Sequence, residues 1–414
     1  MIFYRSSLVR AIIPAEMKIL VVCQFYYPET FSITSICEGW VKQGHDVQVV
    51  TGLPNYGFDR ILEGYENIHD EVINGVRVHR CKLYPRGKSR MSIIKNYLSF
   101  WKSSKKYIRH MKEEFDVVYS MSLSPIISVV GANIYAKKHH VPHVLHCLDL
   151  WPESTVVTHA IKKNSLLYRV LFVWSKSIYK KADKILISSP SFKDYFSDVL
   201  KLDTSNIAEA YQPPLIVPQK GEDIKYDHAY NIVYAGNIGA IQMVEELTKA
   251  MVTASKECDV ALHLIGMGAK QNEVQNIVQE NHLEDRVFYY GPKARAITTA
   301  YFKNATALVV TLREGGFVGR TIPNKLTSSL HYGRPILACI TGDGRKVLEE
   351  SQGAVFAENE TAESLSDAII RLCKMSENER NTLGKNNEKY FEEHYAFDKL
   401  LDRITSELMS AKKR

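Results

Sequence analysis

Short apolar runs recur along the chain, separated by segments with the spacing of helices. Such runs are typical of strands buried on both faces of a parallel sheet. Strands that alternate with helices indicate a doubly wound α/β domain. In the first half of the chain, strands are predicted at 18–23, 46–51, 75–81, 115–120, 143–148 and 184–188.

The alternation stops between Asn206 and His228 and then restarts. This segment contains Pro213 and Pro214 and has no long periodic run, so we interpret it as a linker. The pattern predicts two Rossmann-like doubly wound domains that face each other across a cleft, where ligands bind. In the second half, strands are predicted at 231–235, 260–265, 287–290, 307–310 and 335–338, and helices at 241–256, 268–281, 293–303, 323–332 and 362–375.

The two ends of the chain complete this organisation. The segment before Met17 is a poor signal peptide, because arginines interrupt its apolar stretch, and we expect it to be disordered or not native. The last predicted helix, 385–411, carries apolar side chains that could pack back on the first domain. The predicted parts are therefore an extension (1–16), an N-terminal domain (17–205), a linker (206–228), a C-terminal domain (229–384) and a C-terminal helix (385–414).

The stretch 313–335 carries the strongest candidate chemistry. It follows a predicted buried strand and begins with a carboxylate, Glu314, and a glycine-rich loop, and a helix is predicted to start near Pro323. A strand's carboxyl end beside a helix N-terminus is where open α/β sheets bind phosphorylated ligands. An ordinary strand–loop–helix crossover is the alternative. The candidate ligand-binding residues are Glu314, Gly315, Gly316, Arg320, Asn324 and Lys325.

Three further strand ends in the second domain carry glycines. Each loop alone is a weak motif and could be an ordinary tight turn. Their backbone N–H groups could nevertheless face a phosphate. Because all these strand ends lie on one edge of one sheet, the loops are expected to converge with the Glu314 loop. The candidates are Gly236, Asn237, Gly239, Gly266, Gly268 and Gly291.

The matching strand end in the first domain is D-L-W-P-E-S, residues 149–154. Asp149 and Glu153 frame Trp151, which is an unusual polar and aromatic cluster for a crossover. One carboxylate could bind an acceptor hydroxyl or act as a base. A cap for the following helix is the alternative. We expect no metal site, because no D-x-D follows a strand and no histidine pair has ligand spacing.

Composition adds few constraints. The net charge of +7 is mild, and the seven cysteines show no C-x-x-C pair, which favours a reducing compartment. Two basic, aromatic stretches, 90–102 and 168–181, could lie on an anionic membrane as amphipathic helices; ordinary core packing is the alternative. No nucleic-acid-binding motif is present, so no nucleic-acid partner is expected.

Together these motifs resemble retaining glycosyltransferases of family 4 with the GT-B fold. Within that family the chain is most similar to the bacterial O-antigen and capsule L-fucosamine transferase (WbuB-like) subgroup. The resemblance covers nearly everything from Met17 onward. It rests on M-K-I-L-V-V-C-Q-F-Y-Y-P-E (17–29), G-H-D-V-Q-V-V-T-G-L-P-N-Y (44–56), G-V-R-V-H-R (75–80), D-L-W-P-E-S (149–154), Y-A-G-N-I-G (234–239), P-N-K (323–325) and H-Y-G-R-P (331–335).

The chain departs from the family pattern at several points. Ser328 stands where the second of two glutamates is usual, and Leu148 stands where a histidine precedes the retained Asp149. Asn237 and Gln242 occupy the region of the usual diphosphate-gripping Arg and Lys. Lys325, with Arg320, is the candidate replacement.

The resemblance implies a metal-independent hexosyltransferase with no cofactor. A UDP-sugar, such as UDP-N-acetyl-L-fucosamine, would bind the C-terminal domain, and a lipid-pyrophosphate-linked glycan of O-antigen or capsule biosynthesis would bind the N-terminal domain. We expect a cytoplasmic enzyme, peripheral on the inner face of the plasma membrane. A non-hydrolysing nucleotide-sugar epimerase and a non-catalytic sugar-binding protein are the alternatives. The implied catalytic residues are Asp149, Glu314 and Lys325, and the implied acceptor-binding residues are Glu29, Asn55, Trp151 and Glu153.

Overall fold

The computed structural model describes residues 16–412, apart from Phe58, Lys88, Thr158, His159, Leu215, Pro218 and residues 220–222. Of the predicted extension 1–16, all but Glu16 lies outside these residues. The chain divides into two compact units. Unit 1 comprises Met1–Cys147, Val173–Ile185 and Ile404–Arg414, and unit 2 comprises Leu148–Phe172 and Leu186–Arg403.

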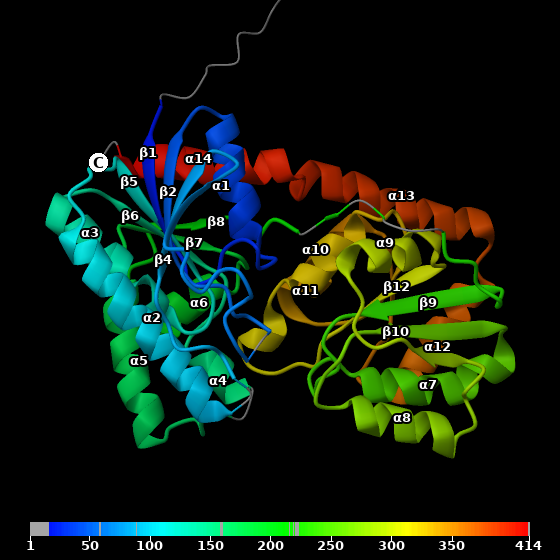
Figure 1. Ribbon diagram of the computed structural model, residues 1–414. Helices are drawn as coiled ribbons and strands as arrows, with labels where there is room; N and C mark the ends of the chain where they lie inside the picture. The colour runs from blue at the N-terminus through cyan, green and yellow to red at the C-terminus, as the bar shows by residue number, and fades with distance from the viewer. Residues whose placement is uncertain are drawn as a thin grey trace, which may run out of the picture. The chain divides into compact units, whose positions relative to one another are not determined.

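The first sheet contains all the strands predicted for the first half of the chain. Its central strands are buried because they are apolar on both faces; Ile19, Leu20, Val21 and Val22 have no exposed surface. The strands are β1 (Lys18–Val22), β2 (Asp46–Gly52), β3 (Asp70–Ile73), β4 (Val76–Cys81), β5 (Val117–Ser122), β6 (His143–Cys147), β7 (Lys184–Ile187) and β8 (Ile207–Glu209) (Figure 1).

Within the described residues, the strand order of this sheet is β3-β4-β2-β1-β5-β6-β7-β8. β1 pairs in parallel with β2 and β5, as the βαβ pattern predicts. β3, which the sequence analysis does not predict, pairs antiparallel with β4 at the edge. It begins with Asp70 and Glu71 and alternates between exposed and half-buried residues, so it lacks the apolar run of the inner strands.

Helices connect these strands and cover the sheet. Phe100 and Ile108 of one helix and Tyr135 of another pack with Leu20 and Val22 in one apolar cluster. The helices are α1 (Ser32–Lys42), α2 (Arg90–His110), α3 (Val130–His139), α4 (Glu153–Val157), α5 (Leu166–Tyr179) and α6 (Phe192–Asp194), with short helical turns η1 (Ile126–Val129) and η2 (Tyr195–Val199).

The second sheet is parallel throughout and lies in unit 2. In the described part of the chain its order is β11-β10-β9-β12-β13-β14, which is a doubly wound arrangement. All five predicted strands are present, and β14 is an additional edge strand. The strands are β9 (Tyr230–Ala235), β10 (Val260–Ile265), β11 (Val287–Tyr289), β12 (Ala307–Thr311), β13 (Ile336–Cys339) and β14 (Ala354–Phe356).

The helices after the linker follow the predicted alternation, with one correction. The single helix predicted over 385–411 is two helices, because Tyr395 leaves the helical conformation and is buried in the core. The second of them contributes Thr405, which accepts a hydrogen bond from Trp40 Nε1 at 2.9 Å within unit 1. The elements are α7 (Val244–Glu257), α8 (Gln271–Glu280), α9 (Arg295–Asn304), η3 (Val318–Arg320), α10 (Asn324–Leu330), α11 (Gly342–Ser351), α12 (Ala362–Lys374), α13 (Glu377–His394) and α14 (Phe397–Lys412).

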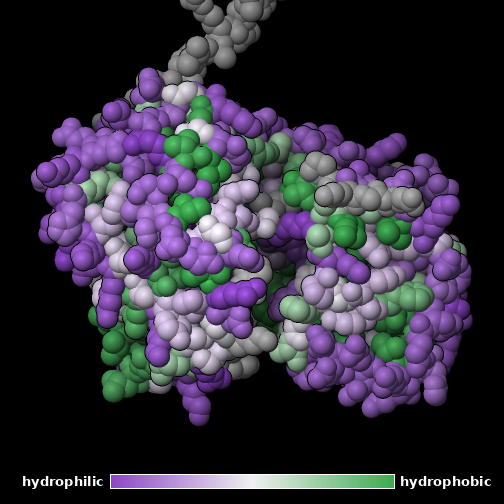
Figure 2. Space-filling model, in the orientation of Figure 1, coloured by the Kyte–Doolittle hydropathy of each residue, from purple (hydrophilic) through white to green (hydrophobic). Residues whose placement is uncertain are grey.

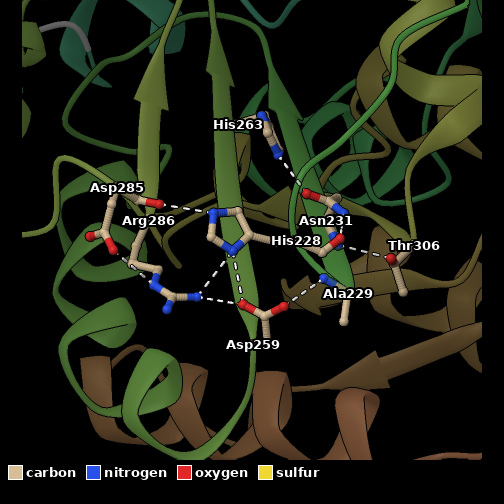
Figure 3. Close-up of polar contacts among 8 residues, drawn as sticks. All are labelled: His228, Ala229, Asn231, Asp259, His263, Asp285, Arg286 and Thr306. Atoms are coloured by element: carbon tan, nitrogen blue, oxygen red, sulfur yellow. Dashed lines mark hydrogen bonds and ion pairs between the residues drawn. The ribbon is translucent and has the colours of Figure 1, made fainter.

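A polar network ties together the amino ends of three neighbouring strands of the second sheet (Figure 3). Asp259, just before β10, accepts hydrogen bonds from the Ala229 N–H at 2.9 Å and from Arg286, just before β11, at 2.6 Å. His228 lies between the Asp259 carboxylate and the Asp285 carbonyl, 2.9 Å from each. This network holds the edge opposite to the glycine loops.

The Asp259 carboxylate gives this edge an acid-sensitive contribution to stability. Its hydrogen bonds, led by that from His228, hold the pKa of Asp259 well below its ordinary value. A lowered folded-state pKa stabilises the fold above the unfolded pKa of about 4, and this contribution is lost as the pH falls further. Asp259→Asn should lower the unfolding free energy by up to about 1 kcal/mol at pH 7, because the side chain is half exposed.

The difference between Asp259→Asn and the parent chain should shrink towards pH 3. Urea unfolding at pH 3, 5 and 7 measures it, and substitution of the exposed Asp59 by asparagine is the control. An undiminished difference at pH 3 would contradict the ionic origin of the effect.

Candidate functional site

The glycine loops of the second sheet converge at its carboxyl edge, as the parallel topology predicts. The Gly236 N–H donates to the Ile265 carbonyl at 2.9 Å, and the Gly266 N–H donates to the Gly291 carbonyl at 2.9 Å. The loops after β9, β10 and β11 are therefore joined by their backbones. The convergence is confirmed, while the roles of these glycines towards a ligand stay predictions.

Two of these glycines are required by the packing of the loops on one another. Gly266 has a φ of +140°, and a Cβ there would lie 1.9 Å from the Gly236 carbonyl oxygen. A Cβ on Gly268 would lie 2.2 Å from the Ile238 carbonyl oxygen. The backbone of the neighbouring loop therefore packs closely against Gly266 and Gly268. By contrast, a Cβ on Gly291 would have no neighbour within 4 Å in the described part of the chain, apart from the adjacent residues.

Lys325, in the first turn of α10, points at this edge. Its ammonium lies 3.5 Å from the centroid of the Tyr234 ring. The position of a Cβ on Gly236 would be 3.2 Å from the same Nζ. Nζ is buried and has no hydrogen-bond partner among the described residues. Tyr234 donates its own hydroxyl to the Asn237 carbonyl at 2.5 Å, so it offers Lys325 only its ring face.

The buried Lys325 ammonium lacks an anionic partner among the described residues. No ion pair to Lys325 occurs in the described part of the chain. Burial lowers the pKa of Lys325 to about 7, because desolvation disfavours the charged form. A buried ammonium without a partner costs free energy that an anion would recover. The arrangement is therefore suited to binding an anion at the carboxyl edge.

The loop between β12 and α10 presents the other predicted residues. Glu314 is exposed, and its N–H donates to Glu360 Oε1 at 2.5 Å. Among the described residues, no atom other than those of the adjacent residues lies within 4 Å of a Cβ placed on Gly315 or Gly316, so these glycines face open space. Arg320 is exposed, at the end of η3.

Arg313, which was not predicted to be functional, anchors this loop. Its guanidinium bridges Glu246 of α7 at 2.5 Å and Glu360 at 3.3 Å. Asn324 is partly engaged within α10, because its Oδ1 accepts a hydrogen bond from the Ser328 hydroxyl at 3.1 Å. The loop is thus held at its base while Glu314 projects from it.

A cavity of about 150 Å³ within unit 2 brings two predicted residues together, Asp149 from the segment after β6 and Asn324 from α10. Tyr211 and Gln212, from the predicted linker, also line it. The sequence pattern does not identify them, because they stand beside Pro213 in a stretch without periodicity. The lining residues are Leu148, Asp149, Leu150, Ser188, Phe192, Tyr211, Gln212, Thr321, Ile322, Pro323, Asn324 and Thr327.

A hydrogen-bond network around a buried carboxylate lies next to this cavity. Asp343 in α11 accepts hydrogen bonds from the Ser189 hydroxyl and the Ser191 N–H, both at 2.7 Å. The Ile322 N–H donates to the Ser189 hydroxyl oxygen at 3.1 Å. The network therefore holds the turn before Pro323 in place. No local motif marks it, since each of its hydrogen bonds joins residues more than 130 positions apart.

The other predicted residues of the D-L-W-P-E-S motif are buried. Trp151 is in the core, and Glu153 begins α4. The Glu153 carboxylate accepts a hydrogen bond from the Tyr168 hydroxyl at 2.5 Å. Asp149, four residues earlier, is the member of this motif that lines the cavity.

Glu29 and Asn55 lie side by side in unit 1. Glu29 Oε1 accepts hydrogen bonds from the N–H groups of Asn55 at 2.7 Å and Tyr56 at 2.6 Å. Burial raises the pKa of the Glu29 carboxyl. Asn55 is fully buried, and its Oδ1 accepts hydrogen bonds from the Arg86 N–H and from Asn96 Nδ2. The Glu29 side chain thus joins the loops after β1 and β2, and the Asn55 side chain joins the loop after β2 to Arg86 and to α2.

Two known domain families match the chain. Residues 31–208 match the family described as "Glycosyl transferase 4-like domain", and residues 229–375 match "Glycosyl transferases group 1". Together the two matches cover most of the chain and most of both sheets.

Two curated proteins are similar to the chain in sequence. A probable glycosyltransferase WbjE from Pseudomonas aeruginosa is 26% identical over 47% of this chain, and the match spans only half the length of that protein. An uncharacterized glycosyltransferase from Haemophilus influenzae is 20% identical over 89% of this chain and 92% of its own.

Several solved structures share the fold at low sequence identity. Sucrose-phosphate synthase from Thermosynechococcus elongatus superposes with a TM-score of 0.71 at 16% identity, covering 94% of this chain and 98% of its own. HepE from Anabaena, solved with UDP, gives 0.66 at 15% identity over 95% and 100%. WaaG, a glycosyltransferase involved in lipopolysaccharide biosynthesis, gives 0.64 at 12% identity over 94% and 99%.

Proposed function

Because the chain belongs to the GT-B glycosyltransferases, we propose that it transfers a sugar from a nucleoside diphosphate sugar to a glycan acceptor. The GT-B fold predicted from the sequence is confirmed. The observation that carries the proposal is the buried Lys325 ammonium, which has no hydrogen-bond partner among the described residues at the carboxyl edge of the second sheet. The diphosphate of a donor would give this cation its missing partner.

The proposed donor is a UDP-sugar bound along this edge. HepE, which shares the fold, was solved with UDP and with UDP-glucose, which favours UDP as the nucleotide. Lys325 would stabilise the negative charge that develops on the leaving diphosphate, a role that needs no metal. The exposed Glu314 would bind sugar hydroxyls, and Arg320 would assist at the phosphates. N-acetyl-L-fucosamine is the proposed sugar, from the subgroup resemblance alone.

The proposed acceptor is a lipid-pyrophosphate-linked glycan of O-antigen or capsule biosynthesis. Asp149, which lines the same cavity as Asn324, would orient the acceptor hydroxyl there. We propose retention of configuration, as in family 4, with the acceptor attacking from the face of the leaving group and a diphosphate oxygen taking its proton. The protein then contributes mainly positioning and charge stabilisation.

UDP release from a panel of UDP-sugars, with and without a membrane lipid extract, tests the proposal. We expect UDP release from only one UDP-sugar of the panel, and only when the lipid extract is present. Slow release from one donor that lipid does not stimulate would favour an epimerase or a water-soluble acceptor. Binding of UDP without turnover of any donor would favour a non-catalytic sugar-binding protein.

We also propose that α5 docks on the anionic inner face of the plasma membrane, which would place the enzyme beside a lipid-linked acceptor. Leu166, Leu167, Val170 and Val173 are 55–79% exposed, with the spacing of one helical face. Figure 2 shows an apolar patch over the position of α5 in Figure 1. Between residues 154 and 182 the chain has six lysines and arginines and no acidic residue. Apolar and basic side chains together are typical of interfacial helices.

Carboxylates introduced on this face should weaken membrane binding. In Leu167→Glu/Val170→Glu, the fraction that co-sediments with phosphatidylglycerol vesicles should fall by about tenfold, since apolar insertion is lost and anionic lipid repels the new carboxylates. Val72→Glu is the matched control, because Val72 is 69% exposed on β3. Equal binding by parent and double variant would contradict docking through α5.

A further inference from the structure

A second, larger cavity lies in unit 1, between α2 and the edge strands of the first sheet. Its volume is about 670 Å³, within the range of small-molecule sites. Every residue that lines it belongs to unit 1, so it shares no residue with the Asp149 cavity or the Lys325 site. The lining residues are Gln48, His69, His79, Arg80, Cys81, Lys82, Ser103, Lys106, Tyr107, His110, Met111, Lys112 and Glu113. We call it the α2 groove.

The floor and wall of the α2 groove are built from polar and aromatic groups. The His79 and Tyr107 rings stack at 3.5 Å with an interplanar angle of 5°, which gives a flat wall. His79 is held by Asp70, whose Oδ1 lies 2.7 Å from Nδ1. Gln48 on β2 is buried, and its Oε1 has no hydrogen-bond partner among the described residues. A side-chain amide offers a ligand a donor or an acceptor, depending on its orientation.

The rim of the α2 groove carries unbalanced positive charge. Lys82, Lys106 and Lys112 are exposed, and none of them forms an ion pair in the described part of the chain. The lining carboxylate Glu113 is already paired with Arg77 at 2.8 Å. The surrounding sequence from Val72 to Lys112 contains no acidic residue. Three unpaired ammonium groups around one concave surface attract an anion.

We propose that the α2 groove binds a phosphate-bearing ligand, with Lys82, Lys106 and Lys112 contacting the phosphoryl oxygens. The His79–Tyr107 stack would pack against the ring or chain that carries the phosphate. A phosphorylated small molecule and a lipid phosphate headgroup present the same chemistry to these lysines. This inference does not depend on the proposed sugar transfer.

Pyrophosphate titration of the full chain carrying Lys325→Met tests the groove, because that substitution removes the anion site of the second sheet. A remaining binding event is expected. Adding Lys106→Glu/Lys112→Glu should raise its Kd by about tenfold or more, which corresponds to the loss of a few weak ionic contacts. Lys102→Glu is the matched control, since Lys102 is exposed on the same helix but does not line the groove.

Phosphatidylglycerol vesicles distinguish the two sources of phosphate. The vesicle experiment uses a chain that also carries Leu167→Glu/Val170→Glu, which removes docking through α5. If Lys106→Glu/Lys112→Glu weakens vesicle binding in this chain but does not weaken pyrophosphate binding, the ligand is a lipid headgroup. If the same substitutions weaken pyrophosphate binding, the ligand is a soluble phosphate. The proposal is overturned if neither pyrophosphate nor the vesicles bind the Lys325→Met chain. It is also overturned if the variant with Lys106→Glu/Lys112→Glu binds both ligands as well as the variant with Lys102→Glu does.

Discussion

Lys325→Met should lower kcat/KM for UDP-sugar turnover by about 10³-fold, as expected when a preorganised charge on a leaving group is removed. The ammonium is buried against Tyr234 and Gly236 and has no hydrogen-bond partner among the described residues. Methionine preserves most of the volume and none of the charge. Initial rates of UDP release over a range of donor concentrations measure the effect.

The same substitution should stabilise the protein, which separates lost activity from misfolding. Burial lowers the pKa of Lys325 to about 7, below its ordinary value of about 10.4. The unfolded chain therefore holds this proton more tightly, and the buried ammonium destabilises the fold at and below neutral pH. Lys325→Met should raise the melting temperature at pH 6. Lys249→Met, on the exposed face of α7, is the control. Full activity of Lys325→Met would contradict the proposed role.

Gly266→Ala should lower the unfolding free energy by about 3 kcal/mol or more, from backbone strain and overpacking combined. The residue has a φ of +140°, and its new Cβ would lie 1.9 Å from the Gly236 carbonyl oxygen. Because that contact is with backbone, no side-chain rotation relieves it. Urea unfolding measures the loss.

Gly315→Ala is the matched control for this substitution. The φ of Gly315 is not in the left-handed region, and beyond the adjacent residues no atom that the structure describes lies within 4 Å of the added Cβ. Its stability should therefore change by less than about 0.5 kcal/mol, as for most surface substitutions. Equal stabilities of the two variants would show that the loops after β9 and β10 move apart easily.

The sequence predicts the fold well where apolar runs are long. The inner strands β1, β2, β5, β9, β10, β12 and β13 carry such runs, and parallel pairing then places their carboxyl ends together. The convergence of Gly236, Gly266 and Gly291 follows from that topology alone. The edge strand β3 lacks the signal, because it begins with Asp70 and Glu71 and none of its four residues is buried.

Parts of the candidate site depend on contacts between distant segments, which no local pattern reveals. The hydrogen bonds of Asp343 with Ser189 and Ser191 join residues more than 150 positions apart. The Glu153–Tyr168 hydrogen bond likewise needs the chain to turn between α4 and α5. Sequence motifs therefore identified Lys325 as a cation of interest, but only the packing around Tyr234 shows that its ammonium is buried without a partner among the described residues.

The pH dependence of UDP binding tests the central claim most directly. If Lys325 binds the diphosphate, Kd should rise by up to about tenfold per pH unit from pH 7 to 9, because the unliganded lysine loses its proton near pH 7. In Lys325→Met the same titration should be weaker and flat. A Kd independent of pH in the parent chain, or an equal Kd in Lys325→Met, would contradict the placement of the donor diphosphate at this lysine.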